Sequence, residues 1–538
     1  MTRLAALPIL ASFAIACAPA AAPAPAPAPA PVPAAPLTEA PLNWHLLDAA
    51  DRVPGISLLR AERELLAGRQ PRRTVIVAVI DGGVDTAHAA LRSRLWLNPL
   101  ETPGNGRDDD NNGYADDMRG WNLIGGRDGK NVHQDTFELT RLASQCSRPA
   151  ARDSMPAAFR ARCAELEAEL ARKRNEAQGI LAQVLQIDAL LTQITPFLRR
   201  ATRSDSLTKA NVEAINSTND TVRQARGVYL QLLSNGLDAA EVAAAKKAYE
   251  SQVQFGYNPN FDPRPIVADG YPDTTVKRYG NRDVTGPDAT HGTHVAGIIA
   301  SQRDGGGTGI APSVRIMALR TVPDGDERDK DVAYAIRYAV DQGANVINMS
   351  FGKAYSPYKA QVDAAVKYAD SKGVLMVHGA GNDGKDLGST PSFPTPVYDA
   401  GAGRAVNWIE VGATSWKSGD SLVANFSNYG KAQVDVFAPG VDIYSTIPGG
   451  YKKESGTSMA SPVVAGLAAL LMSYYPNLTA ADVKRIILES ATKMTDVMVL
   501  RPGPGSARVR FGDLSATGGI VNAFAALRMA EQFSRARP

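Results

Sequence analysis

Short, continuously apolar runs that alternate with helical patterns constrain the fold more than any other feature. The longest runs are TVIVAVI at 74–80, VRIMAL at 314–319 and ANVINMS at 344–350, and shorter ones follow at 374–377, 411–414 and 434–437. Strands that are apolar on both sides belong in a sheet that is covered on both faces. Helical patterns lie between and after them, at 291–302, 330–342, 357–371, 458–475 and 480–491. This alternation predicts an α/β domain with a mostly parallel sheet.

Residues 137–255 interrupt this alternation, because they contain no strand pattern. Apolar residues follow a heptad-like spacing on a helix that begins near Pro156 and that we expect to end at Pro196, since proline breaks the hydrogen-bond ladder. They are Leu166, Leu170, Ala177, Ile180, Val184, Ile187, Leu191 and Ile194, with Lys173 as one interruption. Two shorter helical patterns follow near 218–233 and 238–253. The segment predicts an inserted all-α hairpin or small bundle with coiled-coil-like packing. A disordered linker is the alternative, and the apolar seam argues against it.

The N-terminal residues 1–17, MTRLAALPILASFAIAC, have the form of a secretory signal. Their apolar run is too short to span a bilayer and ends in small residues before Cys17. The ending resembles the lipobox of bacterial lipoproteins, in which the Cys carries lipid; an ordinary export signal cleaved after Ala16 is the alternative. Residues 18–36 form an Ala- and Pro-rich spacer, which is extended and semi-rigid. We expect an exported lipoprotein held at the periplasm, outer membrane or cell surface through Cys17.

Charge and cysteine content limit the classes of binding partner and the redox compartment that we expect for this chain. Lys and Arg number 58 and Asp and Glu number 55, so bulk charge predicts no nucleic-acid binding and no membrane contact beyond the anchor. An exported chain meets oxidising conditions, and Cys146 and Cys163 remain if Cys17 is lipidated. We expect these two to form a disulfide, with two free thiols as the alternative.

Four polar residues lie where a parallel sheet places its functional site. Asp81 directly follows the first apolar run, and sites of open α/β sheets lie at the carboxyl ends of strands. His291 opens the helical pattern HGTHVAGIIA, whose spacing to His294 does not fit the zinc pattern H-E-x-x-H. Asn382 lies in a Gly-rich turn, from which its amide can donate to an oxyanion. Ser458 begins a buried helix, whose N-terminus favours negative charge. Each of these residues alone also fits a turn or cap.

Together the four residues follow the order Asp, His, Asn, Ser. The stretches VIVAVIDGGVDTAH, HGTHVAGIIA, VHGAGNDG and GTSMASPVVAGLAALL resemble the Asp, His, oxyanion-hole and Ser motifs of subtilisin-like serine peptidases, the subtilase family. The resemblance covers most of the chain from about residue 40 to 534, apart from the insertion. It implies a three-layer α/β fold with a mostly parallel sheet over residues 37–534, interrupted by the helical insertion at 137–255.

The resemblance also implies a role for each matched residue. Ser458 would be the nucleophile, His291 the general base, Asp81 the carboxylate that orients the imidazole, and Asn382 an oxyanion donor. His294 would pack or hydrogen-bond beneath His291. The substrate would be a polypeptide and no organic cofactor is expected. The residues implied to bind substrate are Ser350, Phe351, Gly352, Gly379 and Ala380.

An acidic stretch at 108–117, DDDNNGYADD, has the spacing of a calcium loop, with oxygen ligands at alternate positions and a glycine at the sixth. The position of the usual bidentate Glu holds Arg119, and Asp117 is a candidate replacement. A solvated acidic turn is the alternative, but adjacent carboxylates repel one another without a cation. The candidate calcium ligands are Asp108, Asp110, Asn112, Tyr114 and Asp116.

A lipase, a surface lipoprotein and a binding protein without catalysis are the alternatives to a peptidase. A lipase of the α/β-hydrolase type needs a His after the nucleophile, and the last His of the chain is His378. A catalytically minor surface lipoprotein would use the helical insertion to bind a protein partner. A binding protein without catalysis is expected to have lost a residue of the triad, and this chain has all three. We therefore expect a serine endopeptidase.

Overall fold

The computed structural model describes residues 37–153, 156–273, 275–304 and 306–535. The predicted signal, Cys17 and the Ala- and Pro-rich spacer lie outside the described residues. The chain from Pro41 onward is one unit.

The core of this unit is a nine-stranded sheet in the order β10-β13-β7-β6-β5-β4-β1-β3-β2. All neighbouring strands are parallel except β10 and β13. The six predicted apolar runs supply its centre, and the edge strands are short, with few apolar residues to reveal them. The bounds are β1 Ile76–Asp81, β2 Gly120–Asn122, β3 Arg315–Arg320, β4 Val346–Met349, β5 Leu375–Gly379, β6 Trp408–Thr414, β7 Val436–Pro439, β10 Thr492–Lys493 and β13 Gly519–Ile520.

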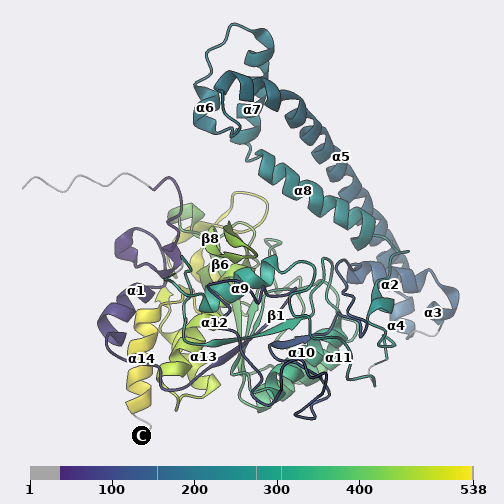
Figure 1. The fold of residues 1–538 in the computed structure, drawn as a ribbon, viewed down its shortest axis with the longest axis vertical. Coiled ribbons are helices and arrows are strands. Elements are labelled where there is room, and N and C mark those ends of the chain that lie inside the picture. Colours follow the sequence, from purple (N-terminus) through teal and green to yellow (C-terminus); the bar gives the residue numbers. More distant parts are fainter. Residues whose placement is uncertain (1–36, 154–155, 274, 305, 536–538) are drawn as a thin grey trace, which may run out of the picture. The chain divides into compact units, whose positions relative to one another are not determined.

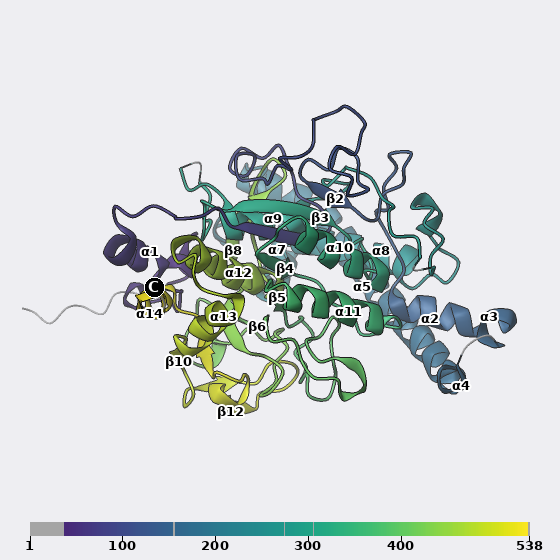
Figure 2. The ribbon, with the colours of Figure 1, turned by 90° about the horizontal axis from the view of Figure 1, so that it is seen from below.

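Helices cover both faces of the sheet and complete the predicted three-layer α/β fold (Figures 1 and 2). Alternate strand residues such as Ile80, Leu319 and Met376 pack with α10 and α11 in one core cluster. The other face is covered by α9 and α12, which also pack against each other. The bounds are α9 Thr290–Ala300, α10 Asp329–Asp341, α11 Lys359–Ser371, α12 Thr457–Tyr474, α13 Ala480–Glu489 and α14 Ala523–Arg535.

Smaller elements lie outside the nine-stranded sheet and the helices that cover it. Two antiparallel hairpins lie outside the main sheet, and a short helix precedes β1. Their bounds are α1 Leu58–Ala61, β8 Ile443–Ile447, β9 Gly450–Glu454, β11 Met498–Leu500 and β12 Arg508–Arg510.

The segment between β2 and α9 contains the predicted all-α insertion, coloured blue to teal in Figure 1. Its long helix α5 runs beside α8, and α6 and α7 pack at the far end around Leu198, Val212 and Tyr229. Figure 1 shows this far end well separated from the sheet. The bounds are α2 Glu138–Cys146, α3 Pro149–Asp153, α4 Ala157–Arg160, α5 Cys163–Thr202, α6 Lys209–Glu213, α7 Asp220–Ser234, α8 Ala239–Ser251 and the π-helix η4 Gln252–Gly256.

Two predicted limits of the long helix are wrong. Pro156 precedes the short helix α4, and α5 begins only at Cys163. Pro196 does not end α5, which continues to Thr202. An internal proline costs about 3 kcal/mol, but Ile194 and Leu198 on either side of it are buried against the other helices of the insertion. Packing of these side chains offsets the lost hydrogen bond.

A disulfide joins Cys146 at the end of α2 to Cys163 at the start of α5, as the sequence predicted. The two half-cystines pack with Leu139, Leu142 and Leu166 in a separate apolar cluster. The bridge therefore ties together the two helices where the insertion meets the α/β domain.

Candidate active site

The carboxyl edge of the sheet brings together Asp81 and His291, which are 210 residues apart in sequence. Asp81 is the buried last residue of β1, and His291 lies in the first turn of α9. His291 Nδ1 is 2.8 Å from Asp81 Oδ1 and 3.0 Å from Oδ2. An imidazole that donates from Nδ1 leaves Nε2 as its acceptor. Asp81 thus holds the imidazole in the tautomer that a general base needs.

Glycine allows α9 to approach this edge. A Cβ at Gly292 would clash with the carbonyl oxygen of Gly83, and a Cβ at Gly297 would clash with Thr446 Oγ1 of β8. A larger residue at Gly292 would push the helix away from this edge. Such a shift would carry His291 away from Asp81.

Ser458 lies in the first turn of α12, beside the end of β4. Its Oγ donates to the carbonyl of Ser350 at 3.2 Å, and Ser350 Oγ donates to the carbonyl of Ser458 at 3.0 Å. In this arrangement the Ser458 hydroxyl faces Ser350 rather than the imidazole, although a hydroxyl can rotate. The first amides of a helix have no partner within the helix, so the Ser458 N–H is available to an anion.

The side chain of Asn382 has a fixed orientation. Its Oδ1 accepts from the backbone N–H of Thr457 at 2.9 Å and from Thr457 Oγ1 at 3.0 Å. Because Oδ1 is occupied, Nδ2 is the end of the amide that is left to donate to a ligand. Nδ2 has no hydrogen bond to any residue that the structure describes. Asn382 therefore presents a donor next to Ser458.

The pKa values of the two histidines of HGTHVAGIIA are shifted in opposite directions. Burial disfavours a charged imidazole at His291, but the Asp81 carboxylate overcomes it and raises the pKa to about 9. At His294 burial prevails and lowers the pKa to about 4. His294 Nε2 donates to the carbonyl of Lys452 at 3.1 Å. His294 is thus a neutral, buried group with a structural hydrogen bond, as expected from the sequence.

A cleft of about 850 Å³ runs past Asn382 and Ser458. Of the residues predicted to bind substrate, four contribute to its lining, and His291 is not among the lining residues. Ala380 is the exception, because its side chain is fully buried in a core cluster. It alternates with Gly379 and Gly381, and successive residues of an extended strand point to opposite sides. The four lining residues are Ser350, Phe351, Gly352 and Gly379.

His378 in β5 supports the cleft from behind. It is fully buried, and its Nε2 donates to the carbonyl of Phe351 at 2.8 Å. Its Nδ1 lies 2.8 Å from Glu410 Oε1, and Glu410 Oε2 accepts from Trp408 Nε1 at 2.8 Å. Burial opposes a charge on the imidazole, but Glu410 overcomes it and raises the pKa of His378. The pair fixes the backbone of the cleft wall at Phe351.

The opposite wall of the cleft was not foreseen from the sequence. It is built by the insertion, where α2, the start of α5 and the residue after η4 meet the α/β domain. A heptad pattern marks only the buried seam of a helix and says nothing about what its other faces contact. The wall residues are Phe137, Leu139, Arg162, Glu165, Glu169, Lys173 and Tyr257.

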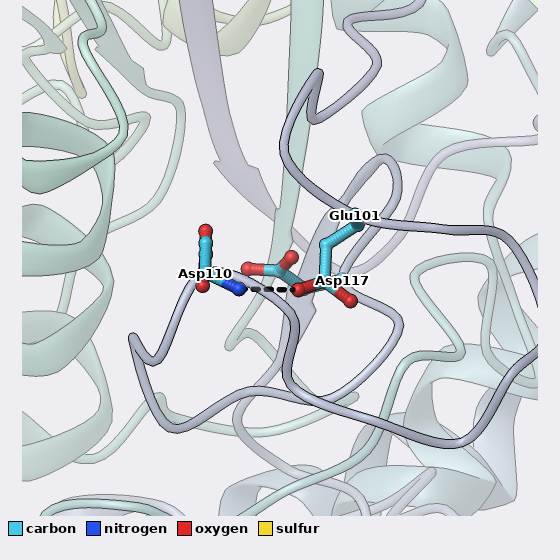
Figure 3. Close-up of side chains that lie close together, drawn as sticks. All are labelled: Glu101, Asp110 and Asp117. Carbon is cyan, nitrogen blue, oxygen red and sulfur yellow. Dashed lines mark hydrogen bonds between the residues drawn. The ribbon is translucent and has the colours of Figure 1, made fainter.

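The acidic stretch folds into a cluster that differs from the predicted ligand set. One carboxylate oxygen each of Glu101, Asp110 and Asp117 lies within 4.8 Å of the others (Figure 3). Asn98 Nδ2 donates to Asp117 at 2.7 Å and to Asp110 at 3.1 Å. Asn112 Nδ2 also donates to both carboxylates. Burial raises the pKa of Asp117, although Tyr338, Asn98 and Asn112 donate hydrogen bonds to its carboxylate.

Three of the residues predicted to bind calcium lie outside this cluster and make other contacts. Asp108 accepts from the backbone N–H groups of Asn112 and Gly113. Asp116 pairs with Arg282 at 2.6 Å, and the ring of Tyr114 packs on Trp121 and Tyr338. Of the predicted carboxylate ligands only Asp110 belongs to this cluster, the predicted ligand Asn112 lies beside it, and Asp117 joins as the replacement considered from the sequence. Carboxylate oxygens together with the oxygens of Asn98 and Asn112, if their amides turned, fit a hard cation such as calcium.

Comparison with known proteins identifies the family of this chain. The model of the subtilase family matches residues 72–503. A thermophilic serine proteinase of Bacillus sp. (strain AK1) is 45% identical over 209 residues, which are 38% of this chain and 47% of that protein. Subtilisin BL of Lederbergia lenta is 37% identical over 232 residues, 42% of this chain and 80% of that protein.

A third relative has a similar sequence identity, but the match covers a smaller part of that protein. The cell wall-associated protease of Bacillus subtilis (strain 168) is 38% identical over 208 residues, which are 38% of this chain and 21% of that protein. This chain spans less than half of the thermophilic proteinase and most of subtilisin BL. The family model nevertheless covers well over half of the chain and includes all four motifs. The chain therefore belongs to the subtilase family of serine endopeptidases.

Proposed function

We propose that this chain hydrolyses internal peptide bonds of polypeptides with Ser458 as its nucleophile. The observation that carries the proposal is the hydrogen bond between Asp81 and His291 at the sheet edge that also holds Ser458 and the oriented amide of Asn382. The order of the four residues along the chain and the Asp81–His291 hydrogen bond support an acyl-transfer site.

In the first half of the reaction, the Ser458 hydroxyl turns from Ser350 toward His291 as substrate enters. Its Oγ attacks the peptide carbonyl carbon while its proton passes to His291 Nε2, and Asp81 stabilises the imidazolium that forms. The carbonyl oxygen becomes an oxyanion that accepts from Asn382 Nδ2 and the Ser458 N–H. The C–N bond then breaks, and His291 returns the proton to the leaving amine.

In the second half, a water molecule attacks the acyl group on Ser458 and loses its proton to His291. The oxyanion forms in the same place, the ester bond breaks, and the proton returns to Ser458 Oγ. Ser350, Phe351 and Gly352 follow β4 directly and line the cleft, so they are placed to pair with the extended substrate backbone.

Casein digestion tests this proposal. Wild-type protein should cleave casein, and Ser458→Ala should leave it intact while melting at the same temperature. Cleavage by Ser458→Ala at the wild-type rate would show that another residue is responsible. Failure of the wild type to cleave casein would contradict the peptidase assignment itself.

We further propose that calcium binds at Glu101, Asp110 and Asp117, where three buried or half-buried carboxylates converge. A cation there would relieve their mutual repulsion and stabilise the long loop between β1 and β2. Calcium fits better than magnesium because flexible protein oxygens suit its larger, less regular coordination.

We also propose that the protein is exported and held at a membrane through a lipid on Cys17. The apolar run that ends at Cys17 and the spacer that follows it support this proposal. Replacing Cys17 by Ser should release the protein from the membrane fraction, and equal retention of both forms would favour an ordinary export signal.

A further inference from the structure

A cavity far from the catalytic residues lies at the amino edge of the parallel sheet, where Pro312 and Ser313 lead into β3. Its volume is about 520 Å³, within the usual range for small-molecule sites, about 300–1,000 Å³. Tyr474 at the C-terminal end of α12 lines it, whereas Ser458 lies at the N-terminal end of that helix. At 1.5 Å per residue the two are about 24 Å apart along α12. The cavity is therefore separate from the substrate cleft.

Three segments of the chain build this cavity and are fixed to one another. Residues 62–71, which include the π-helix η3 Glu62–Leu66, form one side, and the residues after α9 form another. Arg303 Nη1 donates to both carboxylate oxygens of Glu62, at 2.8 and 2.7 Å. The backbone N–H of Arg72 donates to the carbonyl of Ser473 at 2.7 Å, which holds the first segment against α12. A cavity on such fixed elements is formed before a ligand arrives.

The charges in the cavity wall are not balanced. Three guanidinium groups and two carboxylates line it: Arg69, Arg94, Arg303, Glu62 and Asp304. Arg303 and Glu62 neutralise each other as an ion pair. Arg69 and Arg94 form no ion pair with any residue that the structure describes, and Asp304 is exposed to solvent. Two guanidinium groups therefore face the cavity region with one exposed carboxylate to offset them.

Arg94 is the residue whose charge is least compensated. Its Nε is buried and has no hydrogen-bond partner within the described part of the chain. Burial lowers the pKa of Arg94, and the neighbouring guanidinium of Arg315 adds to this effect, while Asp304 opposes it. Arginine nevertheless stays charged in proteins. A partly desolvated charge without a partner costs free energy, and a bound anion would recover it.

Arg69 is held in place by neutral groups only. Its Nη1 donates to the carbonyl of Leu65 at 3.3 Å and lies 3.2 Å from the hydroxyl oxygen of Tyr475. Its guanidinium also lies 5.3 Å from the centre of the Tyr475 ring. These contacts orient the group and leave its charge available to an anion.

A phosphate group fits this arrangement better than a carboxylate does. A phosphomonoester carries about 1.5 to 2 negative charges at pH 7 and three acceptor oxygens, and the planar fork of arginine matches its geometry. A carboxylate has only one charge to set against two guanidinium groups. Leu66, Pro71, Pro312 and Leu470 line other parts of the cavity, so there is room for an apolar group attached to the phosphate.

We propose that this cavity binds a phosphomonoester, with Arg94 and Arg69 as the residues that hold the phosphate. The proposal does not depend on the peptidase function. The phosphate belongs either to a small soluble molecule or to a lipid headgroup such as that of phosphatidic acid. Residues 62–71 follow soon after the predicted spacer, and a chain anchored at Cys17 would meet headgroups at a high effective concentration.

Titration calorimetry with inorganic phosphate, at constant ionic strength, tests the binding site. The full chain would carry Ser458→Ala, which prevents self-digestion, and Cys17→Ser, so that it has no lipid of its own. We expect saturable binding, weakened about tenfold or more by Arg94→Gln, since hydrogen bonds to charged groups contribute on this scale. Arg92→Gln is the matched control, because Arg92 is exposed and lies outside the cavity, and it should bind phosphate as the parent protein does.

The melting temperature of each variant shows whether it is folded. Arg94→Gln removes no side-chain hydrogen bond to the described part of the chain, so its melting temperature should not fall. If Arg94→Gln failed to fold, Arg69→Gln would take its place, with the same loss of phosphate binding expected.

Sedimentation with vesicles distinguishes the two sources of the phosphate. Vesicles of phosphatidylcholine with phosphatidic acid would be compared with vesicles of phosphatidylcholine alone. Binding to the former that Arg94→Gln weakens and Arg92→Gln does not would assign the site to a lipid headgroup. Saturable binding of inorganic phosphate without binding to either kind of vesicle would assign it to a soluble phosphomonoester.

The proposal would be overturned if neither inorganic phosphate nor phosphatidic acid bound. It would also be overturned if folded Arg94→Gln bound as tightly as the parent protein. Equal weakening by Arg94→Gln and Arg92→Gln would contradict it as well, because this result would indicate a general attraction of anions to basic residues rather than a site.

Discussion

Replacement of Lys353 by Met should destabilise the protein strongly, because this ammonium group is the buried link between the insertion and the cleft wall. Lys353 Nζ lies 2.8 Å from Glu138 Oε2 and 2.8 Å from Asp329 Oδ1, and all three side chains are at most 3% exposed. It also donates to the carbonyl of Glu327 at 2.8 Å. Methionine has nearly the same length but leaves both carboxylates without this partner.

The magnitude follows from the state of Glu138. Burial alone would raise the pKa of Glu138, but Arg141 and Lys353 overcome burial and lower it from 4.5 to about 2. That change corresponds to about 3 kcal/mol of interaction with the charged form. Removing one partner of a buried ion pair typically costs about 3–5 kcal/mol. Since Arg141 remains 2.7 Å from Glu138, we expect the lower end, about 3 kcal/mol.

The loss of stability caused by Lys353→Met should be greater at neutral pH than in acid. Because the pKa of Glu138 is lowered in the folded state, its contribution to the free energy of unfolding is complete above about pH 4.5 and is lost as the pH falls toward 2. Loss of Lys353 brings the folded pKa of Glu138 closer to 4.5. The difference between wild type and Lys353→Met should therefore be largest near neutral pH and shrink in acid.

Urea unfolding at pH 7 and pH 3 measures this effect, with Ser458→Ala in every protein to prevent self-digestion. Lys130→Met is the matched control, because its pair with Asp128 is highly exposed and such surface pairs contribute about 0–1 kcal/mol. A Lys353→Met protein as stable at pH 7 as Lys130→Met would refute the reasoning.

Three further outcomes are expected. Asn382→Ala should lower kcat by about a hundred- to thousandfold, the loss found when such a donor is removed from a subtilisin, with little change in KM; an unchanged kcat would remove this amide from the oxyanion hole. The kcat/KM for a peptide should rise with pH as His291 loses its proton, with a midpoint near the pKa of about 9. Asp81→Asn should lower turnover and move that midpoint to lower pH, and an unmoved midpoint would assign the titration to another group. Removal of calcium by a chelator should lower the melting temperature of the wild type, and Glu101→Gln should abolish that response while Asp108→Asn keeps it; the reverse pattern would favour the ligand set read from the loop spacing.

The residues at the carboxyl edge of the sheet could be predicted because the sequence patterns that mark them are local. Buried parallel strands are continuous apolar runs, and the residues that follow them, such as Asp81 and Asn382, reach the same edge by topology. Assignment by motif placed Ala380 in the cleft because a motif carries no information about which side of a strand a residue faces. Alternation along the backbone places it in the core instead.

The insertion and the acidic cluster depend on contacts that no local pattern encodes. Pro196 looks like the end of a helix until the packing of Ile194 and Leu198 is known. Glu101 lies outside the loop spacing and joins Asp110 and Asp117 only through the folded path of the chain. The position of Tyr257 at the cleft likewise depends on how the insertion meets the α/β domain.

Fluorophosphonate labelling followed by peptide mass spectrometry tests the central claim most directly. The probe phosphonylates a serine only when a neighbouring base activates it, so the adduct identifies the nucleophile. We expect one adduct on Ser458 in the wild type and none on that residue after His291→Ala. A folded wild type that gives no adduct, or an adduct on a different serine, would contradict the account of this site.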